Sequence, residues 1–184
     1  MRSTLEEHRR RLTQIAPDDS EVTRLANSLN PHLSRFGFRK PHERLRRQMV
    51  DVILETQEHK PFFWIDSVLP YCWNEPKDWG KTHIVYQWGH LNPRNQVGDS
   101  GEITDLCLMS PRCNNHIQSS LPLPDVQEYF KGAAVGARIE EVLGRRRLLF
   151  ESAAWNKLMS ELMAYRKPEP GNLLRSSRSV SENT

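Results

Sequence analysis

The sequence predicts an α+β protein in which two short strands and a short helix form a compact unit inside a mainly helical domain. Three observations support this class. Apolar residues recur at helical spacing toward both ends of the chain, β-branched and aromatic residues gather in two runs near its middle, and a Ser-Pro pair follows the second run. The length of 184 residues, with 37% hydrophobic and 27% charged residues, suits one domain with a small appendage.

The first part of the chain, residues 1–60, is predicted to be a basic helical region. Apolar stripes or capping residues predict three helices, at residues 3–14, 20–29 and 41–58. Asn30-Pro31 is expected to end the second helix, and residues 34–40 are expected to be a basic connector. Pro41 is expected in the first turn of the third helix, where proline is tolerated.

Arginine dominates the charge of this region. Residues 1–47 hold eleven Lys or Arg against six Asp or Glu, a surplus larger than the formal net charge of +3 of the whole chain. Because a guanidinium donates in pairs to phosphate, we expect part of this surface to bind nucleic acid. The expected contacts are Arg39, Lys40, Arg44, Arg46 and Arg47. The alternative is that these side chains only form a solvated helix face.

The middle part, residues 61–121, is predicted to hold the strand–loop–strand–helix unit. A strand is expected over residues 83–88, a loop over 92–101 and a second strand over 102–109. Ser110 is expected to cap the helix that follows, with Pro111 in its first turn.

Two helices and a tail are predicted for the remainder. The C-terminal helices of residues 122–166 are expected at 125–143 and 147–166. Arg145, Arg146 and Arg147 are expected to form a solvated face. Residues 167–184 are rich in Pro, Gly, Ser and Arg, and we expect a disordered tail there.

Residues 88–119 resemble the ββα-metal motif of the HNH, or His-Me finger, nuclease superfamily. Gly-His-Leu-Asn-Pro at 89–93 is similar to the element in which a catalytic His ends the first strand. Asp105-Leu106 stands where the family carries a central Asn-Leu or Asn-Ile pair, and residues 110–115 match the start of the metal-binding helix. The Gly-His-x-x-Pro spacing is also similar to that of non-specific DNA and RNA nucleases of this kind.

The resemblance implies a metal-dependent DNA endonuclease of restriction, phage or mobile-element type, with Mg²⁺ or Mn²⁺ as cofactor. It implies His90 as the general base that activates water and Asn114 as the metal ligand, with Asn115 and His116 as fallback ligands. This is chemically sound, because a neutral imidazole accepts a proton near pH 7 and Mg²⁺ needs few protein oxygens. The metal would offset charge on the leaving oxygen.

Supporting roles follow from the same resemblance. It implies that Asp105 fixes the loop carrying His90 and that Arg94 or Arg112 clamps the scissile phosphate. Counting along the colicin-type DNases places Gln118 where those enzymes carry a further His ligand.

Gly89 departs from the family, because many members carry Asp or His directly before the catalytic His as a second metal ligand. The site is then a one-ligand type, or receives a carboxylate from elsewhere, or is inactive. Two other functions therefore stay open. One is a non-catalytic nucleic-acid-binding protein with a degenerate ββα scaffold, and the other is a nuclease toxin or effector domain.

The three cysteines are too few for a disulfide framework, which favours a cytoplasmic location. Buried free thiols are expected rather than a structural zinc site, because no tight Cys pair is present. No run of apolar residues suits a membrane span. DNA is the expected partner, with RNA left open, and cutting both strands of a duplex would suit a homodimer.

Overall fold

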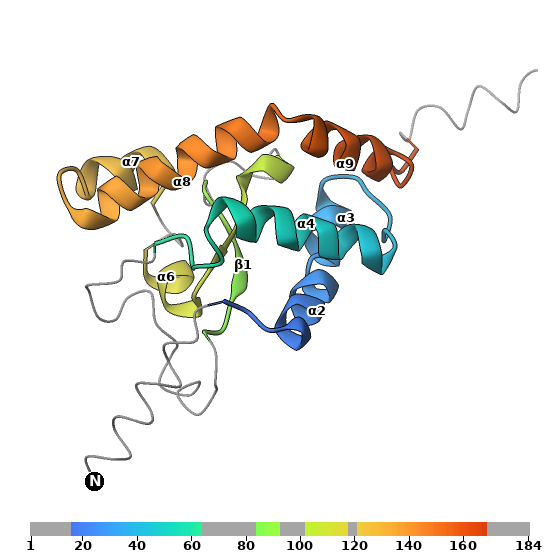
Figure 1. Cartoon of the computed structure of the whole chain (residues 1–184), viewed down its shortest axis with the longest axis horizontal. Helices are drawn as coiled ribbons and strands as arrows, with labels where there is room; N and C mark the ends of the chain where they lie inside the picture. The colour runs from blue at the N-terminus through green and yellow to red at the C-terminus, as the bar shows by residue number, and fades with distance from the viewer. Residues whose placement is uncertain (1–15, 64–83, 93–101, 118–120, 169–184) are drawn as a thin grey trace, which may run out of the picture.

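The computed structural model describes residues 16–63, 84–92, 102–117 and 121–168. In chain order the elements are α2 (Asp19–Ser28), α3 (Asn30–Arg35), α4 (Glu43–Thr56), β1 (Gln87–His90), the 3₁₀ turn η2 (Ile103–Asp105), β2 (Leu106–Met109), α6 (Pro111–His116), α7 (Leu123–Tyr129), α8 (Ala134–Phe150) and α9 (Ala153–Met163) (Figure 1). The described residues are mainly helical with one antiparallel strand pair, so the predicted α+β class is confirmed at this level.

The hairpin of β1 and β2 lies close to the predicted strands, but both strands are shorter. Gln87 pairs with Met109 at one end of the hairpin, and His90 pairs with Leu106 at the other. The first strand was predicted to begin at residue 83, but the backbone N–H of Tyr86 donates to the Glu21 carboxylate at 3.0 Å. The chain before β1 is therefore bonded to α2. Part of the predicted second strand, Ile103–Asp105, forms η2 instead of strand.

The N-terminal helices follow the predicted apolar stripes. Helices α2 and α4 confirm the predictions for 20–29 and 41–58, although Pro41 lies before α4 and His42 is its N-cap. Pro31 does not stop the chain from being helical, because it occupies the first turn of α3, where a missing N–H costs nothing. The helix predicted over 3–14 lies outside the described residues.

The C-terminal helices are divided differently from the prediction. Gly132, with a φ of 78°, separates α7 from α8. Helix α8 then continues through Phe150 instead of ending near residue 143. The second helix begins only at Ala153, because the Ser152 hydroxyl accepts the N–H of Trp155 at 3.1 Å and caps α9.

One core joins these elements. Helix α4 packs against α2, α8, α9 and β2, so it lies at the centre of the molecule (Figure 1). Buried apolar side chains from the regions predicted at 1–60, 61–121 and 122–166 meet there, including Leu25, Ile53, Leu108, Val142 and Leu162. The predicted boundaries after residues 60 and 121 therefore run through one continuous hydrophobic cluster.

On the edge of β2 that faces away from β1, the backbone groups of Leu108 are hydrogen-bonded to the Gln57 side chain and to the backbone of Phe62. The buried Gln57 amide accepts the N–H of Leu108 at 3.0 Å and donates to the Leu108 carbonyl at 2.8 Å. The N–H of Phe62 donates to the same carbonyl at 2.9 Å. Gln57 therefore bonds to β2 as the backbone of a neighbouring strand would.

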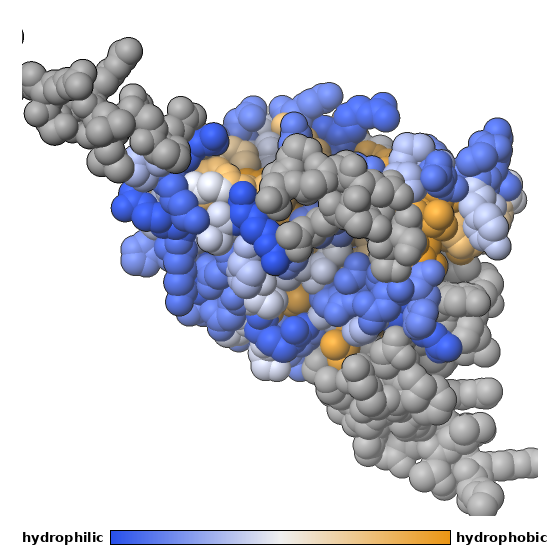
Figure 2. Space-filling view, turned by 180° about the vertical axis from the view of Figure 1, so that it is seen from behind, coloured by the Kyte–Doolittle hydropathy of each residue, from blue (hydrophilic) through white to orange (hydrophobic). Residues whose placement is uncertain are grey.

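The surface seen from behind is mainly hydrophilic, with small separate hydrophobic areas (Figure 2). Within the described ranges, every helix is too short or too polar to cross a bilayer.

Candidate functional site

The two strands and the helix of the predicted unit are present, and α6 packs against β1. The predicted loop lies outside the described residues from position 93 to 101. The Ser110 hydroxyl accepts the N–H of Cys113 at 3.3 Å, and Pro111 lies in the first turn, so the helix begins as predicted. One turn later, the Asn114 amide nitrogen donates to the carbonyl of Trp88 at 3.4 Å. The candidate metal ligand is thereby held beside the strand that carries His90.

The Asn114 side chain packs closely against Gly89. A Cβ placed on Gly89 would lie 2.9 Å from the Asn114 Oδ1 and 3.0 Å from the Met109 sulfur, both closer than ordinary contact. The carboxamide oxygen thus lies where a side chain at position 89 would begin. Glycine at this position lets Asn114 keep its place beside β1.

His90 ends β1 and is bonded to a second histidine. Its Nε2 lies 3.2 Å from Nδ1 of His32, and the two ring centroids are 5.3 Å apart. Phe36 also lies beside His90, with ring centroids 6.4 Å apart. His32 was not predicted, because Asn30-Pro31 suggests a helix stop, whereas these residues begin α3, which carries His32.

Asp105 ties the two ends of the loop together. Its carbonyl accepts the N–H of Leu91 at 2.9 Å, and its carboxylate accepts the Asn92 amide at 3.2 Å and the Glu102 N–H at 3.4 Å. These bonds hold the residues directly after His90 against the start of β2. The geometry is therefore compatible with the loop-fixing role that the resemblance implies.

Arg146 supports the same loop from α8. Its guanidinium donates to the carbonyls of Thr104 at 2.6 Å and Leu106 at 2.8 Å, on either side of Asp105. Only 2% of Arg146 is exposed. The expectation of a solvated face was wrong for this residue, because the carbonyls that bind it lie forty residues away in sequence and leave no local signal.

The other predicted site residues lie around α6 or outside the described ranges. Asn115 and His116 are exposed on α6, and Arg112 is half-buried. Arg94 and Gln118 lie outside the described residues. Among the residues that the structure describes, no group of three or more His, Cys, Asp and Glu could hold a metal ion.

The described donors nevertheless fit a hard divalent cation that needs one protein oxygen. Asn114 presents a carboxamide oxygen beside the strand end, and Mg²⁺ keeps several water ligands when protein ligands are few. Asn114 is therefore the residue that would hold Mg²⁺ or Mn²⁺ here.

The predicted nucleic-acid contacts divide into exposed and buried residues. Arg39, Lys40 and Arg44 are exposed. Arg47 is half-buried and donates to Asp19 and Thr23 of α2.

Arg46 differs from these residues, since only 3% of it is exposed. It donates to the Ala26 carbonyl and to the Asn27 side chain, both at 2.9 Å. Arg46 is therefore not part of an exposed basic surface as expected, because it joins α4 to the end of α2.

Two of the three cysteines lie in the described ranges, and both are buried free thiols. Burial raises the pKa of the Cys107 thiol to about 12, so it stays protonated at neutral pH. Cys107 in β2 and Cys113 in α6 therefore pack as small apolar side chains behind the site. Cys72 lies outside the described residues.

Comparison with protein-family models, with curated proteins and with solved structures finds no match to this chain.

Proposed function

We propose that this protein is a metal-dependent endonuclease that hydrolyses phosphodiester bonds in DNA. The observation that carries the proposal is the arrangement at the end of β1. His90 ends the strand, and the oxygen of Asn114 lies against the residue directly before it. His90 and the residue that Asn114 contacts are thus consecutive in β1, and this closeness along the strand supports the pairing of a base and a metal ligand that the resemblance to HNH nucleases implies.

His90 is the general base in this proposal. In the tautomer whose Nε2 carries the proton and donates to His32, Nδ1 of His90 is the basic nitrogen. In that tautomer His90 takes the proton of the attacking water at Nδ1. His32 then holds the ring in one orientation, as partners of catalytic histidines commonly do.

Asn114 would hold the divalent cation through Oδ1. When bound, the cation supplies positive charge to the phosphate and to the leaving oxygen. Asn114 itself is held by the Trp88 carbonyl and by its contact with Gly89, so its oxygen has a defined position before substrate binds.

The residues directly after His90 are held in place by the start of β2. Asp105 binds Leu91 and Asn92, and Arg146 binds the carbonyls on either side of Asp105. A reaction that depends on placing a base and a cation around one phosphate benefits from such a support. The exposed Arg39, Lys40 and Arg44 supply cations for phosphate contacts, which salt should weaken.

The deciding experiment is a nicking assay on supercoiled plasmid with Mg²⁺ or Mn²⁺, with EDTA as the metal-free arm. Wild type should nick the plasmid, His90→Ala and Asn114→Ala should lose most of this activity, and both should still bind DNA in a gel-shift assay. Asn115→Ala tests the fallback ligand, since Asn115 is the exposed neighbour of Asn114. It should remain active.

Three outcomes would contradict the proposal. Absence of nicking with each of Mg²⁺, Mn²⁺, Ni²⁺ and Zn²⁺ would refute the nuclease activity. DNA binding without cleavage would indicate the non-catalytic scaffold instead. Loss of binding and cleavage together in Asn114→Ala would give that residue a folding role.

A further inference from the structure

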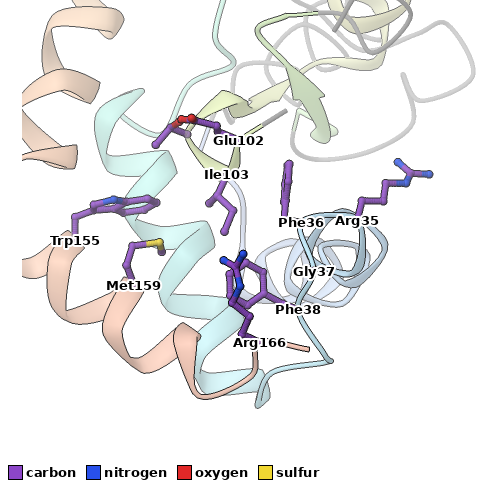
Figure 3. Close-up of a pocket in the computed structure, with 10 residues that line it drawn as sticks. Arg35, Phe36, Gly37, Phe38, Glu102, Ile103, Trp155, Met159 and Arg166 are labelled. Atoms are coloured by element: carbon purple, nitrogen blue, oxygen red, sulfur yellow. The ribbon is translucent and has the colours of Figure 1, made fainter. Parts of the chain in front are cut away.

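A pocket of about 570 Å³ opens next to the candidate catalytic histidine. Its walls come from the turn after α3, from η2 and from α9. The lining residues are Arg35, Phe36, Gly37, Phe38, Glu102, Ile103, Thr104, Trp155, Met159 and Arg166 (Figure 3). Its volume lies within the range of roughly 300–1,000 Å³ that is usual for small-ligand pockets.

Three aromatic side chains and two aliphatic ones, Ile103 and Met159, contribute to the walls of this pocket. Phe38 and Trp155 are 5% exposed each, and Phe36 is half-buried. Figure 3 shows Trp155 and Met159 on one side, Phe36 and Phe38 on the other, and Ile103 between them. Flat apolar walls of this kind suit a planar aromatic ligand, because a ring can lie against another ring without a hydrogen-bond partner.

The turn that presents the two phenylalanines is firmly tied. Gly37 adopts a φ of 83°, and its carbonyl accepts the N–H of Lys167 at 2.8 Å. Phe38 pairs with Arg166 in an isolated antiparallel bridge. The left-handed conformation of Gly37 lets the residues on either side of it both line the pocket.

The pocket shares walls with the proposed active site. Phe36 lines it and also lies beside His90, at 6.4 Å between ring centroids. Glu102, Ile103 and Thr104 line it and lead directly into Asp105, whose carbonyl binds Leu91. Through Phe36, this pocket therefore adjoins the place where His90 would meet the phosphate of a bound strand.

The rim of the pocket is mostly cationic. Arg35, Arg39, Lys40, Arg166 and Lys167 are exposed along it or in the adjoining chain, and Glu102 is an acidic residue in the lining. Arg166 lies over the Phe38 ring, with its guanidinium carbon 5.9 Å from the centroid. Exposed cations beside aromatic platforms are the combination that binds single-stranded nucleic acid, since the cations follow the phosphates and the rings stack on bases.

We propose that this pocket receives one unstacked base of the strand that is cut, so that the protein prefers single-stranded or locally opened DNA. The inference rests on the proposed nuclease function and adds its substrate class. A base inside an intact duplex is covered on both faces by its neighbours, so it cannot lie against Phe36 and Trp155 without leaving the stack.

The test measures binding rather than cleavage. Fluorescence anisotropy is recorded in EDTA with a fluorescein-labelled oligodeoxythymidine and, separately, with a labelled duplex of the same length. Phe36→Leu keeps an apolar side chain but removes the ring, and it should weaken single-strand binding roughly 5- to 150-fold. Phe36→Trp keeps a ring and should bind the single strand like wild type. Duplex binding should change little in both variants.

Two matched controls test location. Tyr129 is an aromatic residue with 78% exposure outside this pocket, so Tyr129→Leu should leave both affinities unchanged. Arg166→Ala and Arg147→Ala each remove one exposed arginine, but only Arg166 lines the pocket. Arg166→Ala should weaken single-strand binding more than Arg147→Ala does, and this comparison stands even when the Phe36 variants fail to fold.

Equal weakening of single-strand and duplex binding by Phe36→Leu would overturn the inference, as would wild-type affinity in that variant or the absence of single-strand binding by wild type. Each of these results leaves the plasmid assay as a separate test of the nuclease. Conversely, single-strand binding that depends on Phe36, together with an inactive plasmid assay, would support the pocket and refute the enzyme.

Discussion

Replacing Gly89 with alanine tests the central geometry of the site. The new methyl group would lie 2.9 Å from the Asn114 oxygen, whereas ordinary contact begins at 3.4 Å, so the carboxamide must move by about 0.5 Å or change rotamer. Misplacing a reacting group by about 1 Å can cost about 10²-fold in rate. We therefore expect Gly89→Ala to lower the rate of plasmid nicking roughly 10- to 100-fold.

The same substitution should change stability much less. Adding a methylene group to a packed site costs about 1–3 kcal/mol, but the atoms that it meets are the ends of the Asn114 and Met109 side chains, which can move. Alanine also has less freedom than glycine in the unfolded chain, which offsets about 0.5–1 kcal/mol. The free energy of unfolding should therefore fall by no more than about 2 kcal/mol.

The assay pairs single-turnover nicking with urea unfolding. Gly144→Ala is the matched control, because a Cβ at Gly144 in α8 meets nothing within 4 Å. It should leave the nicking rate unchanged and raise stability by about 0.5–1 kcal/mol. Wild-type nicking by Gly89→Ala, at full stability, would refute the argument that the position of the Asn114 oxygen matters.

Three further predictions concern the supports of the site. His32→Ala should lower the nicking rate about tenfold. His32→Asn keeps a polar partner for His90 and should retain more activity. A wild-type rate in His32→Ala would show that the contact between the two histidines does not contribute to catalysis. Arg146→Met should lower the free energy of unfolding by about 2–4 kcal/mol, measured in urea, because the carbonyls of Thr104 and Leu106 lose their buried partner. Glu58→Gln should lower stability by less than about 1 kcal/mol at pH 7, since Glu58 is partly exposed.

The effect of Glu58→Gln on stability should depend on pH. Hydrogen bonds from Arg145 and Arg138 hold the pKa of Glu58 below its ordinary value. The stabilisation is therefore fully present above the pKa of the unfolded carboxyl, about 4.3, and is lost as the pH falls through the lower folded value. Unfolding curves of wild type and Glu58→Gln should converge in acid, and a constant difference down to pH 2 would contradict the assignment.

Local signals predicted the elements that local chemistry decides. The apolar stripes of α2 and α4 and the Ser110-Pro111 start of α6 lie where the sequence placed them. The predicted strand and helix boundaries that were wrong are those set by contacts with residues far away in the sequence. Tyr86 bonds to Glu21 of α2 and so lies outside β1, and no pattern within residues 83–88 carries that information.

The side chains whose surroundings were not predicted share the same cause. A pattern assigns arginine to the surface, yet Arg46 and Arg146 are buried because each finds backbone carbonyls on another element. Likewise, His32 gains its place only when α3 packs beside the end of β1. The motif at residues 89–93 could be found from sequence, whereas its supports depend on the tertiary fold.

The Gln57 amide has a consequence for how the hairpin meets other chains. A two-stranded sheet offers unsatisfied N–H and carbonyl groups that can recruit a foreign strand. At Leu108 these groups are already engaged by Gln57 and Phe62. A foreign strand could pair with β2 only if those bonds were broken. The fold therefore disfavours the edge-to-edge strand pairing of fibrils on that side.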